Sequence, residues 1–228
     1  MSLDWLSFMM IGGWPDGPPG GLLINIGLAV SCFLMGFMFA VPLALLRMAG
    51  GRISGFCATA FIEVLRSTPL ILLLFWCHFL LPIMIGINIP PLLSAFIALT
   101  LYSSAYQAEI VRAGFSSVPS GEVEAAQSTG LSKSQVFINI VIPQGLRRMI
   151  PASASFAVSL FKDTAVIYVV GVIDLMQSGL IAAERNPNKM LISYLVMAAG
   201  FAVVGVIISF VGYKLENRLN FIRKVVAE

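Results

Sequence analysis

Charged residues are scarce in this chain, and their scarcity excludes most soluble classes of protein. Only 11% of the 228 residues are charged, while 58% are hydrophobic. A soluble domain carries about 25% charged residues. So few polar side chains cannot cover a water-soluble globule of this size. The composition therefore predicts an integral membrane protein and excludes a soluble enzyme or a nucleic-acid-binding domain.

The chain also lacks the clusters from which metal, disulfide and hydrolytic sites are built. Its three cysteines, Cys32, Cys57 and Cys77, are scattered through apolar sequence without a CxxC pair, which argues against a zinc site or a disulfide scaffold. His78 is the single histidine of the sequence, and neither HExxH nor GxSxG occurs, so an intramembrane protease is not expected. The phosphate-binding pattern GxxxxGK[ST] is missing too, so the chain is not expected to hydrolyse ATP alone.

Long uncharged runs predict helices that cross a membrane, because such a helix needs about 20 mostly apolar residues. These runs are residues 17–46, 67–108 and 190–213. A break at residues 82–91 divides the middle run into two spans. The first of these two spans is expected to begin near Gly55, and it therefore contains the charged residues Glu63 and Arg66.

The segment 149–175 is harder to interpret, because it contains three charged residues: Lys162, Asp163 and Asp174. We interpret it as a fourth span followed by a short piece that does not cross the membrane, since Gly171, Asp174 and Gly179 interrupt the apolar sequence there. The prediction is thus an all-α integral membrane protein with about five transmembrane helices, forming a single domain over residues 1–228.

Lysine and arginine are distributed very unequally between the two sides of this five-span arrangement. Ten of them lie on the side of the 47–52 loop, the 112–148 loop and the C-terminal tail, against two or three on the other side. Basic residues are retained on the cytoplasmic side. The N-terminus is therefore predicted outside and the C-terminus inside. The start of the chain lacks a basic region before a short apolar core, so no cleavable signal peptide is expected.

The loop of about residues 116–143, between the third and fourth spans, has the chemistry of two short helices joined by a tight turn. Ser120 is expected to cap the first helix, and Gly130 to end it in a left-handed conformation. Ser132 and Gln135 are spaced as a capping box for the second helix. By themselves these signals fit an ordinary amphipathic connector as well as a functional element.

The spacing in this loop resembles the EAA loop of ATP-binding-cassette importer permeases, whose pattern is E-A-A-x3-G-x9-I-x-L-P. The residues that match the pattern are Glu124, Ala125, Ala126, Gly130, Ile140 and Pro143. Only Ile142 departs from it, since the pattern has leucine there. The match lies on the predicted cytoplasmic side of the membrane.

Three further segments are similar to the polar-amino-acid branch of this family, and the resemblance covers about residues 21–219. Residues 63–70 resemble its ExxR(S/G)TPL helix, residues 105–114 its AYxxEIxRAG stretch, and residues 162–165 its KDTS segment with alanine in place of serine. The 161–170 stretch followed by Ala-Glu-Arg looks closest to permeases for acidic amino acids. The resemblance thus implies glutamate or aspartate first, glutamine, asparagine or other polar amino acids next, and basic amino acids last.

The resemblance implies that the elbow is a coupling helix seated in a cleft of a separate nucleotide-binding ATPase subunit. Its residues would be Glu124, Ala125, Ala126 and Gly130. ATP and Mg would be bound by that subunit, and no cofactor is expected in this chain. The other implied partners are a second permease (a similar chain or another copy), a periplasmic substrate-binding protein and membrane lipid, in a bacterial inner membrane. No nucleic-acid partner is expected.

Charged residues at bilayer depth are costly and by default suggest a function. We expect five polar residues to line the substrate path: Arg66, Thr68, Lys162, Asp163 and Thr164. The cations would meet a substrate carboxylate, and Asp163 would receive the ammonium group. For Arg66 the alternative is simple neutralisation by Glu63, three residues earlier on the same helix face. Glu109 and Arg112 have the same spacing and are interpreted as a structural pair.

A subunit of a secondary transporter or channel for small polar solutes is the main competing hypothesis. Such carriers usually contain inverted repeats or paired broken helices at matching positions. Neither is visible in the sequence, and 228 residues is short for a complete carrier.

Overall fold

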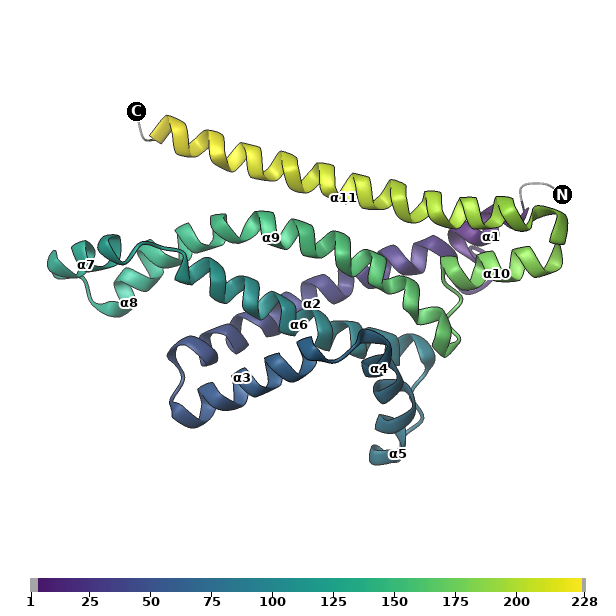
Figure 1. Cartoon of the computed structure of the whole chain (residues 1–228), viewed down its shortest axis with the longest axis horizontal. Helices are drawn as coiled ribbons and strands as arrows, with labels where there is room; N and C mark the ends of the chain where they lie inside the picture. Colours follow the sequence, from purple (N-terminus) through teal and green to yellow (C-terminus); the bar gives the residue numbers. More distant parts are fainter. Residues whose placement is uncertain (1–3, 227–228) are drawn as a thin grey trace.

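The structure is a computed structural model that describes residues 4–226, nearly all of them in helices. The long helices lie roughly along one axis (Figure 1). At one end of this axis lie α7 (Ser120–Ser128) and α8 (Lys133–Val136), and at the other α1 (Asp4–Ile11) and α10 (Leu175–Arg185). The all-α fold class is confirmed. The ends of the predicted domain, residues 1–3 and 227–228, lie outside the described residues.

Within residues 4–226, three helical stretches are long and apolar enough to cross a membrane: residues 21–49, 133–170 and 187–218. The first is α2 (Gly21–Ala49). The second contains α9 (Ile142–Asp163), and the third contains most of α11 (Met190–Val226). They correspond to the first, fourth and last of the expected spans. The 11-residue α10 between the last two is too short to cross a bilayer, as expected for this segment.

The second expected span, from about Gly55, is a bent pair of helical segments in the structure and not one straight helix. α3 (Arg52–Ser67) is followed by a bend of 106°, after which α4 (Leu70–Phe75) and α5 (Leu81–Ile85) continue in a new direction. Pro69 accounts for the bend, because proline has no N–H for the helix ladder and disfavours helical geometry in the preceding residue. Arg66 therefore lies in the last turn of a helix, just before the bend.

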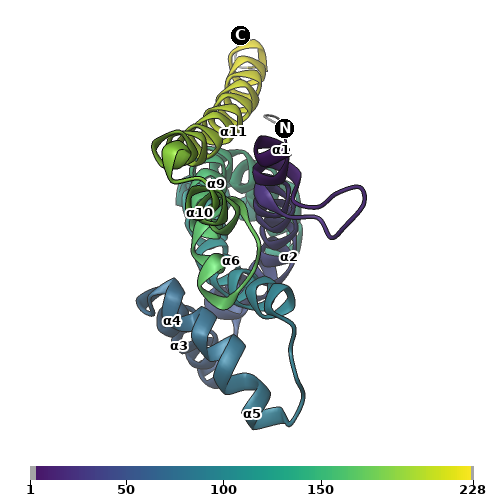
Figure 2. The ribbon, with the colours of Figure 1, turned by 90° about the vertical axis from the view of Figure 1, so that its right-hand side faces the viewer.

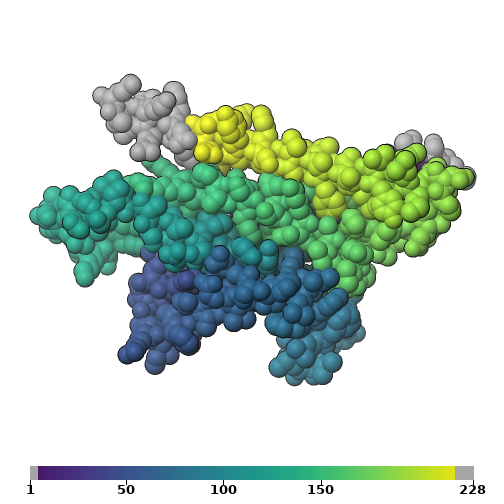
Figure 3. All heavy atoms as spheres, viewed as in Figure 1, coloured from purple at the N-terminus to yellow at the C-terminus, as the bar shows by residue number. Residues whose placement is uncertain are grey.

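The segment after the bend forms an arm that projects from the body of the molecule. In Figure 2, α4 and α5 extend away from the bundle of α2, α6 and α9. The space-filling view shows the same arm standing clear below the body, while α11 follows the upper edge (Figure 3). The arm carries large exposed apolar side chains, among them Ile83 and Met84.

The third expected span is α6 (Pro91–Ser116), the central helix of the fold, packed against α2, α3, α4 and α9. Its 26 residues are long enough to cross a bilayer at about 1.5 Å per residue. Its neighbours cover much of it, and it buries several polar side chains: Ser94, Thr100, Ser103, Ser104 and Gln107. If α6 and the bent pair are each counted as one membrane span, the number of spans is five. The number of spans and their orientation stay predictions.

Close packing of α2 on α6 is made possible by a small residue at the crossing. A Cβ atom added to Gly36 would lie 2.4 Å from the hydroxyl oxygen of Ser103. On the same side Gln107 donates a hydrogen bond from Nε2 to the carbonyl of Phe33, at 2.9 Å. α2 and α6 are therefore close enough for a side chain of one helix to form a hydrogen bond with the backbone of the other.

The elbow of α7 and α8 largely follows the sequence prediction. Gly130 has φ = +90°, the left-handed conformation expected of it. The capping box of Ser132 and Gln135 is present, with N–O distances of 2.8 and 3.3 Å. The expected cap at Ser120 is wrong: Pro119 occupies the cap position, and Ser120 is the first helical residue, without a side-chain capping bond.

Candidate functional site

The first candidate surface is the elbow at one end of the molecule (Figure 1). Glu124, Ala125 and Gly130 are exposed there, whereas Ala126 is buried in the chain itself. A Cβ atom at Gly130 would meet nothing within 4 Å, so its positive φ, and not lack of space, requires glycine at this turn. The structure thus leaves the surface of Glu124 and Ala125 free for a partner, while Ala126 packs inward.

The elbow is tied to the beginning of α9 by side-chain hydrogen bonds. Gln144 of α9 donates to the carboxylate of Glu122 in α7, and Arg148 donates to the backbone carbonyl of Ser117. Displacement of the elbow would therefore pull directly on α9. This matters because α9 ends at Asp163, one of the residues expected along the substrate path.

Arg66, at the end of α3, lies against α6. Its guanidinium carbon is 5.5 Å from the centre of the Tyr106 ring, within range of a cation–π interaction. Tyr106 donates from its hydroxyl to the backbone carbonyl of Arg66, at 3.3 Å. Nε of Arg66 is buried without a hydrogen-bond partner among the described residues. A nearby group that accepts a hydrogen bond would satisfy it.

Glu63 is engaged more closely by another arginine than by Arg66. Its carboxylate lies 3.9 Å from the Arg66 guanidinium but 3.1 Å from that of Arg47 in α2. Arg47 also binds Glu109 of α6, at 2.9 Å, and Arg112 pairs with the other oxygen of Glu109. The interpretation of Glu109 and Arg112 as a structural pair fits this cluster, which joins α2, α3 and α6.

Aromatic side chains form a wall between Arg66 and Asp163. The rings of Tyr106 and Tyr102 are 4.5 Å apart, and Tyr106 stacks on Phe156 of α9 at 5.7 Å. Asp163, half-buried at the end of α9, lies beside Tyr102, whose hydroxyl interacts with its carboxylate. A cation and an anion therefore border one aromatic surface made by α3, α6 and α9. In the sequence, Tyr106 stands out only as part of the 105–114 motif, without an assigned role, and no signal marks Tyr102.

The other residues expected along the path lie elsewhere. Lys162 is exposed, and its Cε would lie 3.9 Å from a Cβ atom at Gly205 of α11, so it points toward a different neighbour than Asp163 does. The hydroxyl of Thr68 donates to the carbonyl of Val64 in its own helix, at 2.7 Å. Thr164 is completely buried. Of the five residues, the structure brings Arg66 and Asp163 to one surface.

Thr164 belongs to a buried polar network centred on Asn25 of α2. The Asn25 amide donates to the hydroxyl of Thr164 and to the carboxylate of Asp174, both at 3.0 Å. Its oxygen accepts from the backbone N–H of Leu175, at 2.9 Å. Asp174 also caps α10 by accepting from the N–H of Gln177. The network fixes the start of α2, the end of α9 and the start of α10 to one another.

Burial and hydrogen bonding have opposite effects on the pKa of Asp174. Burial raises the pKa of this carboxyl group above its ordinary value, while the hydrogen bonds from the Gln177 backbone and the Asn25 side chain act in the opposite direction. An Asp174 without Asn25 would therefore be protonated more readily. The sequence gives no signal for Asn25, because a single asparagine in an apolar helix belongs to no local motif.

These observations define a class: an all-helical membrane permease with a surface elbow at one end and a charged, aromatic surface between its helices. A family model described as binding-protein-dependent transport system inner membrane component matches residues 22–221. The chain belongs to this family.

Similar proteins and solved structures indicate the kind of transporter to which this permease belongs. The chain is 32% identical over 200 residues to a probable glutamine ABC transporter permease protein, GlnP, of Bacillus subtilis, with 87% of this chain and 91% of the relative covered. It is 29% identical to the glutamate/aspartate import permease protein GltK of Escherichia coli O157:H7, covering 79% of this chain and 83% of GltK. A crystal structure of an amino acid ABC transporter with histidines matches with a TM-score of 0.81 and 28% identity, covering 86% of this chain and 91% of that one. The chain is a permease subunit of an amino acid ABC importer.

Proposed function

We propose that this permease carries acidic amino acids, with glutamine and other polar amino acids as the second candidates. The aromatic surface bordered by Arg66 and Asp163 supports an amino acid as the substrate, and the likeness of residues 161–170, followed by Ala-Glu-Arg, to permeases for acidic amino acids supports the acidic choice. A substrate with two carboxylates and one ammonium group can place a carboxylate at Arg66 and its ammonium group at Asp163. The unpartnered Nε of Arg66 is a donor that such a carboxylate would satisfy.

Electrostatics supports an amino acid zwitterion as the ligand of this surface. An unpaired charge in a low-dielectric passage costs several kcal/mol, so a zwitterion needs fixed charges of opposite sign along its path. Arginine offers a carboxylate two parallel hydrogen bonds, which lysine cannot reproduce. Tyr106 contacts Arg66 twice: its ring lies against the guanidinium group, and its hydroxyl donates to the backbone carbonyl of Arg66. Lys162, Thr68 and Thr164 act in this proposal as supporting residues of the path and not as direct ligands.

Coupling to ATP hydrolysis is assigned to the elbow. Glu124, Ala125, Ala126 and Gly130 would seat α7 on a separate ATPase subunit that binds ATP and Mg. Movement of that subunit would reach α9, and with it Asp163, through the bonds of Gln144 and Arg148. The full importer would contain a second permease and a periplasmic substrate-binding protein, in the inner membrane of a bacterium.

The experiment replaces Arg66 and Asp163, and it uses Arg52, at the other end of α3, as the control. Arg66→Lys and Asp163→Asn should lower amino acid uptake and substrate-stimulated ATPase activity at least tenfold, because the first loses the two parallel hydrogen bonds to the carboxylate and the second loses the negative charge that faces the ammonium group. Arg52→Lys, at the exposed opposite end of α3, should leave both activities unchanged. Both activities are measured in proteoliposomes that contain the ATPase and a saturating concentration of binding protein.

The same proteoliposomes identify the substrate. Uptake of labelled glutamate should be competed by aspartate more strongly than by glutamine, and least by arginine. Normal transport by Arg66→Lys would show that Arg66 is only a structural partner of Glu63 and Tyr106. A preference for glutamine over glutamate would retain the permease and reject the acidic substrate.

A further inference from the structure

Arg66 belongs to a cluster of charged side chains in which one positive charge is left over. This arginine cluster joins α2, α3 and α6 and contains three arginines and two glutamates, namely Arg47, Glu63, Arg66, Glu109 and Arg112. Among the described residues, no further carboxylate is paired with these arginines. The cluster therefore has one guanidinium group more than it has carboxylates.

The surplus charge lies at Arg66. Both oxygens of Glu109 are engaged, one by Arg47 at 2.9 Å and the other by Arg112. Arg47 also binds Glu63, at 3.1 Å. Arg66 is left with a contact of 3.9 Å to Glu63, which is longer than a hydrogen bond. A third carboxylate would therefore find its partner at Arg66.

The carboxylate of Glu63 is shared between two arginines. The same oxygen, Oε1, faces both Arg47 and Arg66. The side chain of Glu63 is 53% exposed, against 21% for Arg47 and 33% for Arg66, so it has more room to move than either partner. A shift of Glu63 away from Arg66 would keep its carboxylate paired with Arg47. Arg66 would then be open to a second carboxylate without leaving a charge of either sign unpaired, which would be costly.

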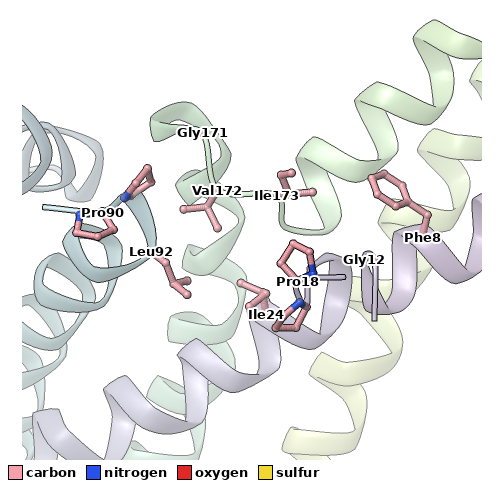
Figure 4. Close-up of a pocket in the computed structure, with 13 residues that line it drawn as sticks. Phe8, Gly12, Pro18, Ile24, Pro90, Leu92, Gly171, Val172 and Ile173 are labelled. Atoms are coloured by element: carbon pink, nitrogen blue, oxygen red, sulfur yellow. The ribbon is translucent and has the colours of Figure 1, made fainter. Parts of the chain in front are cut away.

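The apolar groove at the other end of the molecule offers a carboxylate no such partner. It has a volume of about 390 Å³ and lies between the connection from α1 to α2, the beginning of α6 and the turn before α10 (Figure 4). None of the described residues that line it is charged. A substrate carboxylate therefore gains an ionic partner in the arginine cluster and not in this groove.

We propose that Glu63 is an internal competitor of the substrate for Arg66. Its carboxylate shares Arg66 in the empty permease, moves to Arg47 when a substrate carboxylate binds Arg66, and returns to Arg66 to release the substrate. The inference rests on the proposed function, because it takes Arg66 as the residue that meets this carboxylate. Glu63 acts through Arg66 and is thus a positioning residue.

Competition of this kind meets a requirement of transport. A site along a path must attract its ligand strongly enough to admit it and weakly enough to let it leave. An arginine without a competing anion would retain a carboxylate in a low-dielectric passage, because separation leaves both charges unpaired. With Glu63 beside it, Arg66 exchanges one carboxylate for another.

Two substitutions distinguish this exchange from a purely structural role, because they should change the affinity for glutamate in opposite directions. Glu63→Gln removes the competing charge and should lower the dissociation constant at least tenfold. Arg47→Gln removes the alternative partner of Glu63, which then stays at Arg66, and should raise the constant at least tenfold. Loss of a structural ion pair would instead shift both variants in the same direction. Binding of labelled glutamate to the permease–ATPase complex is measured by equilibrium dialysis in nanodiscs, without binding protein.

The release step is measured separately, as the maximal uptake rate in proteoliposomes with saturating binding protein. Glu63→Gln should lower this rate at least threefold although it binds glutamate more tightly, because no carboxylate then displaces the substrate. Glu63→Asp keeps the charge and should retain most of the rate. The matched control is Glu216→Gln in α11, since Glu216 forms no ion pair among the described residues. It should change neither the affinity nor the rate.

Assembly of each variant is checked by co-purification with the ATPase. If Glu63→Gln does not assemble, Arg47→Gln decides the question, with Arg47→Lys as the control that keeps the charge. Unchanged affinities, shifts of both variants in the same direction, no measurable binding by Glu63→Gln, or loss of assembly in both variants would overturn the inference. Import of glutamine but not of glutamate by the wild-type complex would instead refute the proposed acidic substrate, and the same variants measured with glutamine would then test the competition at Arg66.

Discussion

Replacing Asn25 by leucine tests the buried network that joins α2, α9 and α10. The substitution keeps the branched shape and the number of heavy atoms of the side chain but removes an amide that makes three hydrogen bonds, to Thr164, Asp174 and Leu175. Thr164 still donates to the carbonyl of Phe161, and Asp174 still accepts from Gln177. The variant therefore leaves one buried N–H and one carboxylate oxygen without their Asn25 partner.

The expected loss in the free energy of unfolding comes from these two groups. A buried polar group left unsatisfied costs about 1–3 kcal/mol, although side-chain hydrogen bonds within membrane proteins average only about 0.6 kcal/mol. We therefore expect Asn25→Leu to lower the free energy of unfolding by about 2–4 kcal/mol. Ser31→Ala, one to two turns further along α2, removes bonds only to carbonyls of its own helix and should cost less than about 0.5 kcal/mol.

The assay combines a global and a local measurement. Titration of the purified complex with SDS gives the free energy of unfolding, and hydrogen exchange follows the N–H of Leu175, which should lose protection in Asn25→Leu. Asn25 lowers the pKa of Asp174, which burial raises, so its loss raises that pKa further. Protonation then relieves the defect, and the difference from wild type should narrow as the pH falls through the pKa of Asp174. Unchanged stability and unchanged protection of Leu175 would refute the reasoning.

Two further predictions concern coupling and topology. Gly130→Asp, which forces a side chain into a left-handed turn, and Glu124→Lys should leave the permease folded and inserted but abolish uptake; normal transport by both variants with the ATPase bound would exclude the elbow as the coupling element. Single cysteines at Asp16 and Gly86 in a cysteine-free background should react with an impermeant thiol reagent added outside, whereas one at Ser134 should not. Labelling of Ser134 from outside would overturn the predicted orientation.

Local patterns in the sequence were sufficient for the helical class and for the elbow. A capping box and a left-handed glycine depend on residues within a few positions of each other, so Gly130 and the pair Ser132 and Gln135 were predicted correctly. Ser120 failed because Pro119, just before it, also fits the cap position. The expected second span bends at Pro69, where the run of apolar residues continues but a straight helix cannot.

The substrate surface required contacts that no local pattern contains. Sequence spacing paired Glu63 with Arg66, three residues away, yet the closer partner is Arg47 from α2. Likewise Lys162 and Asp163 are neighbours in the chain but face different helices, because successive residues of a helix are about 100° apart around its axis. Which charges border one passage is therefore decided by helix packing.

The sequence alone determined that this protein lies in a membrane, that it is helical, and that it carries an elbow with EAA spacing. Those properties follow from composition and from interactions between residues close in the chain. The tertiary structure decided the rest: the aromatic wall between Arg66 and Asp163, and the network around Asn25. Each of these joins segments separated by tens of residues, and their juxtaposition depends on the packing of α2, α6 and α9, which no single segment encodes.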